Sequence, residues 1–197
     1  NKIEVSEVAF HELMKIDLKH YGVHALGLGG PEEGFSAQPF QEMFAEAKRQ
    51  GLKSNPHAGE SDGAASIALC IESLKADRIG HGVRAWEDPI VIRDMIDRKI
   101  PIEVCLSSNF KLGVFDRESH PVKKLFDAGV RLSLNTDDPV LFKTNLSFEY
   151  IQAMTHFKFD LNMLRQCTMV ATESLHDESC RLLVRERLIK KFNALEL

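Results

Sequence analysis

Long hydrophobic runs are missing from this 197-residue chain, although 44% of its residues are hydrophobic. No stretch approaches the roughly 18 consecutive apolar residues of a membrane-spanning helix, and no secretory signal is visible. A basic excess is missing as well, because the formal net charge is -4. Proteins that bind nucleic acid through its phosphates show the opposite balance. We therefore expect a globular protein that binds neither membranes nor nucleic acid.

Paired cysteines are also missing. The four cysteines, Cys70, Cys105, Cys167 and Cys180, are scattered without a CxxC pair, which is typical of reduced thiols in a cytoplasmic protein. No low-complexity tract or obvious linker divides the sequence. We therefore expect residues 1–197 to form a single domain, or a piece of one.

The most informative segment that is present is Ser133–Pro139, where an apolar run ends in two adjacent carboxylates, Asp137 and Asp138. Neighbouring acids repel, and their burial is costly unless a cation or fixed donors compensate. Alone, the segment is equally good surface-turn chemistry, because Asp-Asp-Pro favours turns. Its interpretation therefore depends on what accompanies it.

Three further polar clusters follow apolar runs upstream: His57–Glu60, His81-Gly82 and Cys105–Asn109. Helix-like stretches separate them, and the spacing from cluster to cluster is about 24 to 30 residues. A (β/α)8 barrel of about 250 residues uses about 31 residues per unit, and its catalytic groups lie at the C-terminal ends of strands. The alternation predicts an α/β fold with a parallel sheet.

Five strands are expected, near 23–28, 52–55, 78–80, 101–105 and 130–134. Helices are expected at 5–21, 39–50, 63–75, 89–98, 121–128, 147–157, 161–174 and 178–195. A closed parallel barrel needs about eight strands, and the sequence opens without Met directly into a helix-like pattern. We therefore expect the five C-terminal units of a TIM-type barrel plus C-terminal helices, with the N-terminal units absent.

The four clusters, in this order and at this spacing, closely resemble the adenosine deaminase family. The resemblance rests on His57-Ala58-Gly59-Glu60, Gly80-His81-Gly82, Cys105–Asn109 and Asn135–Pro139, and it covers about residues 23–150. It implies a metal-dependent (β/α)8 hydrolase that converts adenosine and water to inosine and ammonia in purine salvage. It also implies a purine nucleoside as partner and one Zn²⁺ at the C-terminal mouth of the barrel.

The resemblance assigns two zinc ligands to this chain, the imidazole of His57 and the carboxylate of Asp137. Both are suitable ligands for zinc, and a dication would keep Asp137 ionised. In the family a His-x-His pair on the first strand adds two ligands, and no such pair occurs here. We therefore expect the two further His ligands to come from the absent N-terminal part.

The resemblance also assigns roles in catalysis and substrate binding. His81 matches the residue that orients the water and accepts its proton, and Glu60 matches the acid that protonates ring N1. Asp138 matches the carboxylate at N7, and Gly30 matches a backbone donor toward N3. Glu60 should hold a proton near pH 7, so we expect burial to raise its pKa.

Simpler interpretations stay open for several of these residues. His57 could be a hydrogen-bonded loop histidine, Glu60 could favour the start of the next helix through its dipole, and Gly30 could be turn punctuation. Cys105 is expected to pack in the barrel wall and not to act as a nucleophile. Asp177, next to His176, is expected to cap a helix.

Two rival functions also remain open. Leu106 stands where the family often has proline, so a related 6-aminopurine such as adenine or modified AMP is an alternative substrate. A non-catalytic half-barrel that binds nucleosides, or another barrel metallohydrolase, is the other alternative. With five strands and two ligands, we expect these 197 residues alone to be inactive, and a separate polypeptide carrying the missing segment to complement them.

Overall fold

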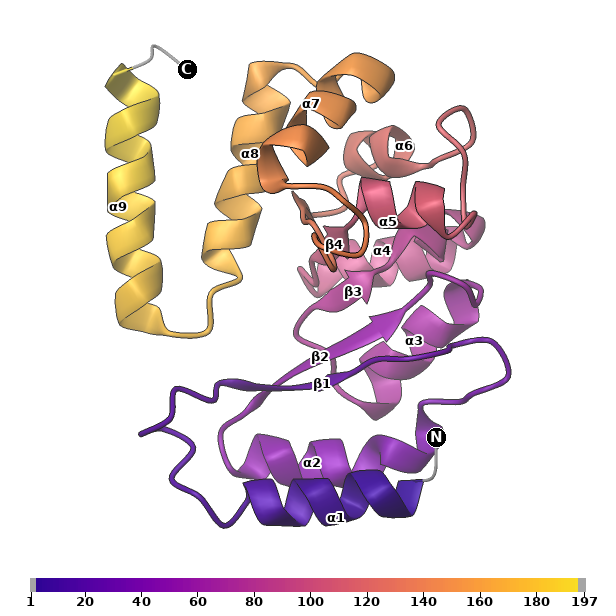
Figure 1. Cartoon of the computed structure of the whole chain (residues 1–197), viewed down its shortest axis with the longest axis vertical. Helices are drawn as coiled ribbons and strands as arrows, with labels where there is room; N and C mark the ends of the chain where they lie inside the picture. The colour runs from indigo at the N-terminus through magenta and orange to yellow at the C-terminus, as the bar shows by residue number, and fades with distance from the viewer. Residues whose placement is uncertain (1–2, 195–197) are drawn as a thin grey trace.

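Five short parallel strands form one sheet in which spatial order follows chain order, β1-β2-β3-β4-β5. The computed structural model describes residues 3–194 (Figure 1). The strands are β1 Ala25–Leu28, β2 Lys53–Ala58, β3 Ile79–His81, β4 Ile102–Val104 and β5 Leu132–Leu134. Because every neighbouring pair is parallel, all five strands end at the same edge of the sheet, and the segments that follow them gather there.

Helices connect the strands and continue after the last one. They are α1 Ile3–Leu13, α2 Gln41–Arg49, α3 Ala64–Ser73, α4 Pro89–Asp97, α5 Leu106–Lys111, α6 Val122–Asp127, α7 Leu146–Phe157, α8 Leu161–Glu173 and α9 Glu178–Ala194, with 3-10 turns η1 Gln38–Phe40 and η2 Val83–Glu87. Within residues 3–194, no helix is long and apolar enough to cross a membrane.

Side-chain caps fix where several helices begin. The carboxylates of Asp88 and Asp160 accept hydrogen bonds from backbone N–H groups in the first turns of α4 and α8, and Asn145 does the same for α7. Asp177 accepts from the N–H of Cys180 at 2.6 Å, which confirms the predicted cap of α9. Such caps typically contribute about 0.5 to 2 kcal/mol.

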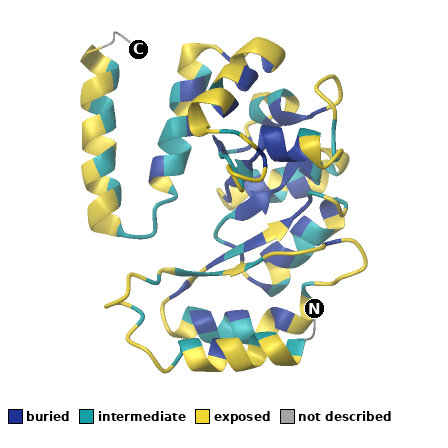
Figure 2. Ribbon diagram, in the orientation of Figure 1, coloured by how far each residue is buried: buried dark blue, intermediate teal, exposed yellow. Residues whose placement is uncertain are grey.

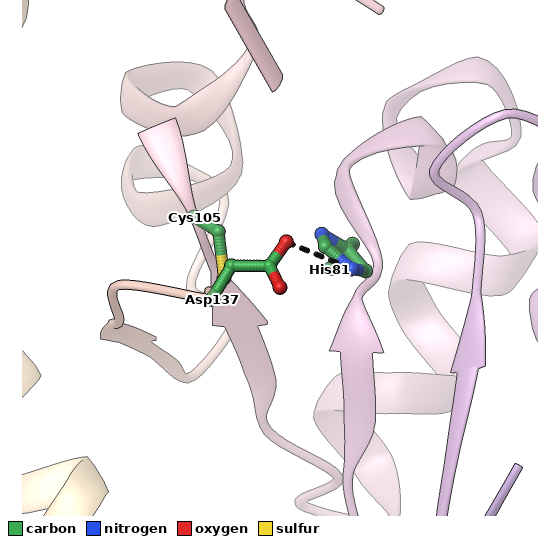
Figure 3. A group of neighbouring side chains, drawn as sticks. All are labelled: His81, Cys105 and Asp137. Carbon is green, nitrogen blue, oxygen red and sulfur yellow. Dashed lines mark ion pairs between the residues drawn. The ribbon is translucent and has the colours of Figure 1, made fainter. Parts of the chain in front are cut away.

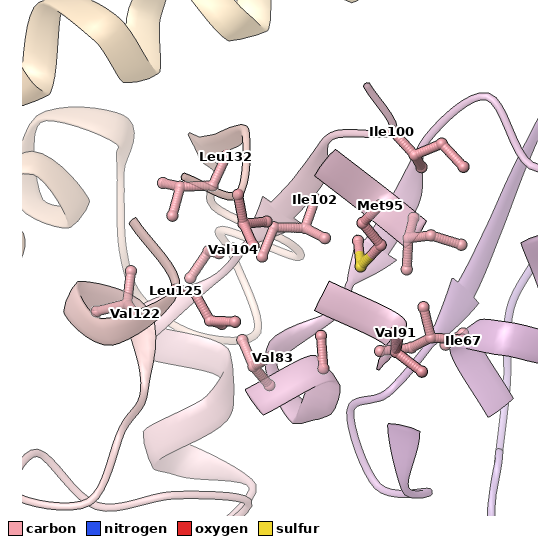
Figure 4. Close-up of a cluster of buried hydrophobic side chains, with 14 of the residues drawn as sticks. Ile67, Val83, Val91, Met95, Ile100, Ile102, Val104, Val122, Leu125 and Leu132 are labelled. Atoms are coloured by element: carbon pink, nitrogen blue, oxygen red, sulfur yellow. The ribbon is translucent and has the colours of Figure 1, made fainter. Parts of the chain in front are cut away.

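The main core lies between the sheet and the helices that follow its strands (Figure 2). Ile102, Val104 and Leu132 from the sheet pack with apolar side chains of the helical layer, including Ile67, Met95 and Leu125 (Figure 4). All are at most 1% exposed, and replacing one of the leucines or isoleucines with Ala would cost about 2 to 5 kcal/mol. This core is what keeps the strand ends fixed relative to one another.

The predicted element types are confirmed, but three predicted boundaries are wrong. The first helix stops at Leu13 instead of residue 21, because Asp17 accepts from the N–H of His20 and forms a separate turn. The second strand continues past Pro56 to Ala58, since His57 and Ala58 pair with β3. His57 therefore lies within a strand and not after it. The predicted end of the last helix, Leu195, lies outside the described residues.

The third error concerns Cys105–Asn109, which was expected only as a polar cluster after a strand and instead runs into the short helix α5. Serine and asparagine are weak helix formers, but contacts from other elements fix this segment. The Ser107 N–H donates to Glu149 at 3.1 Å, and Asn109 Nδ2 donates to Glu60 at 3.1 Å. Tertiary hydrogen bonds have overridden local propensity here.

Candidate active site

Three of the predicted site residues meet at the C-terminal edge of the sheet. His57 belongs to β2, His81 is the last residue of β3, and Asp137 follows β5. The rings of His57 and His81 lie 4.9 Å apart between centroids, and His81 Nε2 lies 4.0 Å from Asp137 Oδ2 (Figure 3). Two imidazoles and one carboxylate from three strand ends therefore face a common space.

That space is a pocket of about 170 Å³. Its lining comprises His57, Gly80, His81, Glu103, Cys105, Asn135 and Asp137. A larger pocket of about 460 Å³ also includes His57 in its lining and extends over the segment after β1, including Gly30 and Phe35. His57 thus faces both hollows.

Two of these residues hold an unusual backbone conformation. His81 has φ +60° and Asp137 has φ +54°, in the left-handed region that side-chain-bearing residues rarely occupy. Such a conformation costs on the order of 1 to 3 kcal/mol and persists where the surroundings enforce it, often at functional sites. The strain coincides with the two side chains that face each other across the smaller pocket.

The absence of a side chain at Gly80 makes room for His57. A Cβ atom at position 80 would lie 2.7 Å from Cδ2 of the His57 ring, well inside contact distance. On the other side, a Cβ at Gly29 would meet the same ring at an ordinary 3.8 Å. The imidazole therefore lies across the neighbouring strands in a slot that only glycine leaves open at position 80.

Glu60 borders the site from the loop between β2 and α3. Its Oε1 lies 3.3 Å from His81 Nδ1 and accepts a hydrogen bond from Asn109 Nδ2 at 3.1 Å. Burial, followed by the nearby charges of Glu32 and Asp137, raises the pKa of Glu60 to about 7. The carboxyl group can therefore hold a proton near neutral pH, as expected from the sequence.

His81 is buried and neutral. It is 3% exposed, and burial, followed by the charge of His57, lowers its pKa to about 4. Its Nδ1 is buried without a hydrogen-bond partner among the described residues, and 3.3 Å from Glu60 Oε1 is close but not well aligned. A buried polar atom without a partner is rare and points to a missing water, ion or ligand.

The donor set fits a divalent metal. Ligand atoms of His81, Cys105 and Asp137 all lie within 4.8 Å of one another, and His57 lines the same pocket. Imidazole nitrogen and carboxylate oxygen are ordinary zinc ligands. The Cys105 thiol is a poor one, because burial and neighbouring carboxylates raise its pKa and its Sγ donates to the Glu103 carbonyl.

The two predicted substrate-binding residues lie at the same end but outside this cluster. Gly30 has φ +113° and lines the larger pocket. Asp138 is exposed, and its side chain makes no hydrogen bond or ion pair within residues 3–194. The structure thus brings four of the six predicted residues together and leaves Gly30 and Asp138 at the rim.

Three polar residues at the site went unrecognised in the sequence. Buried Glu32 accepts hydrogen bonds from the backbone of the Glu60 loop. His120 lies 11 residues beyond Asn109 and bonds to it at 3.1 Å, and Asn109 in turn bonds to Glu60. Glu32 follows the predicted strand-ending glycines, which was an available signal, whereas no local pattern indicates His120.

Comparisons with known proteins agree with this geometry. The adenosine deaminase family profile matches residues 4–191. A protein of Streptomyces coelicolor provisionally named adenosine/adenine deaminase is 45% identical over 139 residues, which is 70% of this chain and 40% of that protein. The adenine deaminase of Rhizobium rhizogenes is 39% identical over 168 residues, 84% of this chain and 52% of that protein.

Solved structures show the same fold. An adenine deaminase from Arthrobacter aurescens superposes with a TM-score of 0.86 at 23% identity, over 95% of this chain and 58% of that one. A zinc-bound amidohydrolase from Burkholderia ambifaria superposes with a TM-score of 0.82 at 24% identity, over 88% and 50%. This chain spans about half the length of the relatives it matches. The five parallel strands correspond to part of a TIM-type barrel, as expected, and the chain belongs to the adenosine deaminase family.

Proposed function

We propose that the protein is a metal-dependent deaminase that hydrolyses adenosine to inosine and ammonia in purine salvage. The observation that carries this proposal is the convergence of His57, His81, Asp137 and Glu60 around one pocket at the C-terminal edge of a parallel sheet. In barrel enzymes this edge is where catalytic groups gather. Membership of the family and the zinc-bound structural relative support the proposal.

His57 and Asp137 are the residues proposed to hold a zinc ion. When bound, zinc lowers the pKa of water to near 7 and so supplies a hydroxide nucleophile at neutral pH. Catalytic zinc sites usually have three protein ligands, and this sequence lacks a His-x-His pair. The two further histidines of the family are proposed to come from polypeptide outside these 197 residues.

The proton transfers are assigned to His81 and Glu60. Neutral His81, with a nitrogen that has no hydrogen-bond partner, can accept the proton that the attacking water loses. Glu60, protonated near pH 7, can donate to ring N1 and make C6 of the purine more electrophilic. The two side chains lie 3.3 Å apart, so base and acid can serve the same small reacting group.

The larger pocket is proposed to receive the nucleoside. Its volume of about 460 Å³ falls in the range of about 300 to 1,000 Å³ that is usual for small-molecule sites. Gly30, in its lining, is proposed to donate a backbone hydrogen bond toward N3. Asp138, at the exposed rim, is proposed to contact N7.

Adenine is the second candidate substrate. Named adenine deaminases occur among the relatives that share the largest part of this chain, and the residues proposed here act on the purine ring, which adenine and adenosine have in common. Other 6-aminopurines, including modified AMP, would also offer C6 and N1 to the same groups. A binding protein without turnover is the non-enzymatic alternative.

The test is a substrate panel with the protein expressed from its complete reading frame and loaded with zinc. Adenosine, adenine and N6-methyl-AMP are each supplied, and ammonia release is measured together with the change in purine absorbance. We expect the fastest turnover with adenosine. Faster turnover with adenine would transfer the proposal to the second candidate, and binding of purines without ammonia release would overturn the enzymatic proposal.

A further inference from the structure

The loop that carries Glu60 is held by a carboxylate from a different segment. Glu32 follows β1, after the turn that begins at Gly29, and is 8% exposed. Its Oε2 accepts from the backbone N–H of Glu60 at 3.0 Å and of Asp62 at 3.1 Å, and its Oε1 lies 3.3 Å from the Glu60 nitrogen. Alternate N–H groups aimed at one oxygen form a concave anion site of the kind called a nest.

Only this loop provides partners for the Glu32 side chain. Within residues 3–194, no lysine, arginine or histidine forms an ion pair with it, and its hydrogen-bond donors are the N–H groups of Glu60 and Asp62. A buried carboxylate is costly unless hydrogen bonds or an opposite charge compensate. The two N–H groups therefore stabilise the charge of Glu32, and Glu32 in return fixes the backbone of residues 60–62.

We propose that Glu32 is a positioning residue that orients Glu60 toward His81 and the pocket. The inference rests on the proposed function, because the orientation of Glu60 matters for turnover only if Glu60 donates a proton. Glu60 has one side-chain hydrogen bond, from Asn109, so its carboxyl direction also depends on where the backbone lies. A displacement of about 1 Å at a reacting group can lower the rate about 10²-fold.

Two substitutions at position 32 separate hydrogen bonding from simple presence of a side chain. Glu32→Gln keeps one acceptor oxygen, which can take the place of Oε2 and accept from both N–H groups. Glu32→Ala removes both acceptors. Glu33 is the matched control, because it is the adjacent acid, is exposed, and has no side-chain hydrogen bond or ion pair within residues 3–194. Glu33→Gln and Glu33→Ala repeat the chemistry without touching the loop.

The readouts are amide hydrogen exchange in residues 59–63 and steady-state kinetics of the zinc-loaded protein. Glu32→Ala should speed exchange at the amides of Glu60 and Asp62, with core strands unchanged. It should lower kcat by about 10²-fold with little change in KM, since the lost orientation acts mainly in the transition state. Glu32→Gln should recover the protection and most of kcat, and both Glu33 variants should match the parent.

Three results would overturn the proposal: unchanged exchange at residues 60 and 62 in Glu32→Ala, faster exchange throughout the core, or the same loss in Glu32→Gln as in Glu32→Ala. The second would make Glu32 a support of the fold in general. If the parent protein does not deaminate, the proposed function fails separately, because the exchange measurement needs no turnover and still decides whether Glu32 holds the loop.

Discussion

The two ends of the sheet carry similar numbers of polar side chains but treat them in opposite ways. At the C-terminal end, His81 Nδ1 is buried without a hydrogen bond, and His81 and Asp137 have left-handed backbone. At the other end, Asp77 lies 2.6 Å from Lys48 and 3.3 Å from Lys53, and Arg131 lies 2.6 Å from Glu173. One end leaves donors and acceptors available, and the other pairs them.

The pKa values follow the same division. Burial raises the pKa of Glu60 at the pocket. Burial also opposes the ionised form of Asp77, but hydrogen bonds from Lys48 and from the Ser54 N–H, together with the charges of Lys48 and Lys53, hold its pKa below the usual value. Paired groups are typical of stabilising contacts and perturbed unpaired groups of functional sites, so the comparison assigns chemistry to one end and stability to the other.

The largest effect is expected from Glu60→Gln. Because Gln cannot donate the proton assigned to Glu60, kcat should fall by about 10² to 10⁴, while zinc content and melting temperature stay close to those of the parent. Ammonia release and metal analysis on the same sample make the measurement, with Glu33→Gln as control. Near-normal kcat with unchanged zinc would remove Glu60 from the mechanism.

Gly80→Ala should have the next largest effect, through the position of His57. The added Cβ would lie 2.7 Å from the imidazole and displace it, so zinc affinity should fall and kcat should drop by about 10². Gly27→Ala is the control, because the Cβ there would meet only the Asn55 carbonyl oxygen, at 3.5 Å. Equal zinc affinity in the two variants, measured by competition with a chelator, would show that the slot at Gly80 does not set the ligand.

At the opposite end, Asp77→Asn should lower stability and leave kcat unchanged. Losing the charge-assisted hydrogen bonds should cost about 1 to 3 kcal/mol in the free energy of unfolding. The folded-state pKa of Asp77 lies below its unfolded value, so its contribution is present above about pH 4 and is lost as pH falls through the folded pKa. The difference between parent and variant, measured by urea unfolding, should therefore shrink below about pH 4. A constant difference across pH would contradict the role given to the charge.

The smallest effect is expected from Arg131→Ala. Its partner Glu173 is largely exposed, and such surface pairs are worth about 0.2 to 1 kcal/mol. Unfolding by urea should show a loss in that range, and ammonia release should be unchanged. A strong loss of turnover without loss of stability would break the division between the two ends.

Much of this division could be predicted from the sequence because the relevant signals are local. The apolar runs before His81 and Asp137 identify strand ends, and parallel strands bring such ends to one edge. The approach of Asn109 and His120 to Glu60, and of Glu32 to the loop after β2, depends on tertiary packing that no spacing encodes. The left-handed conformation of Asp137 is likewise enforced by its surroundings, since the residue type alone does not require it.

Diffraction from crystals of the zinc-loaded protein at the zinc absorption edge is the most direct test of the central claim. The account predicts an anomalous peak at about 2.0 to 2.2 Å from an imidazole nitrogen of His57 and a carboxylate oxygen of Asp137, in the pocket that His81 borders. A zinc peak at the other end of the sheet, or no peak in a protein that still deaminates purines at full rate, would contradict it.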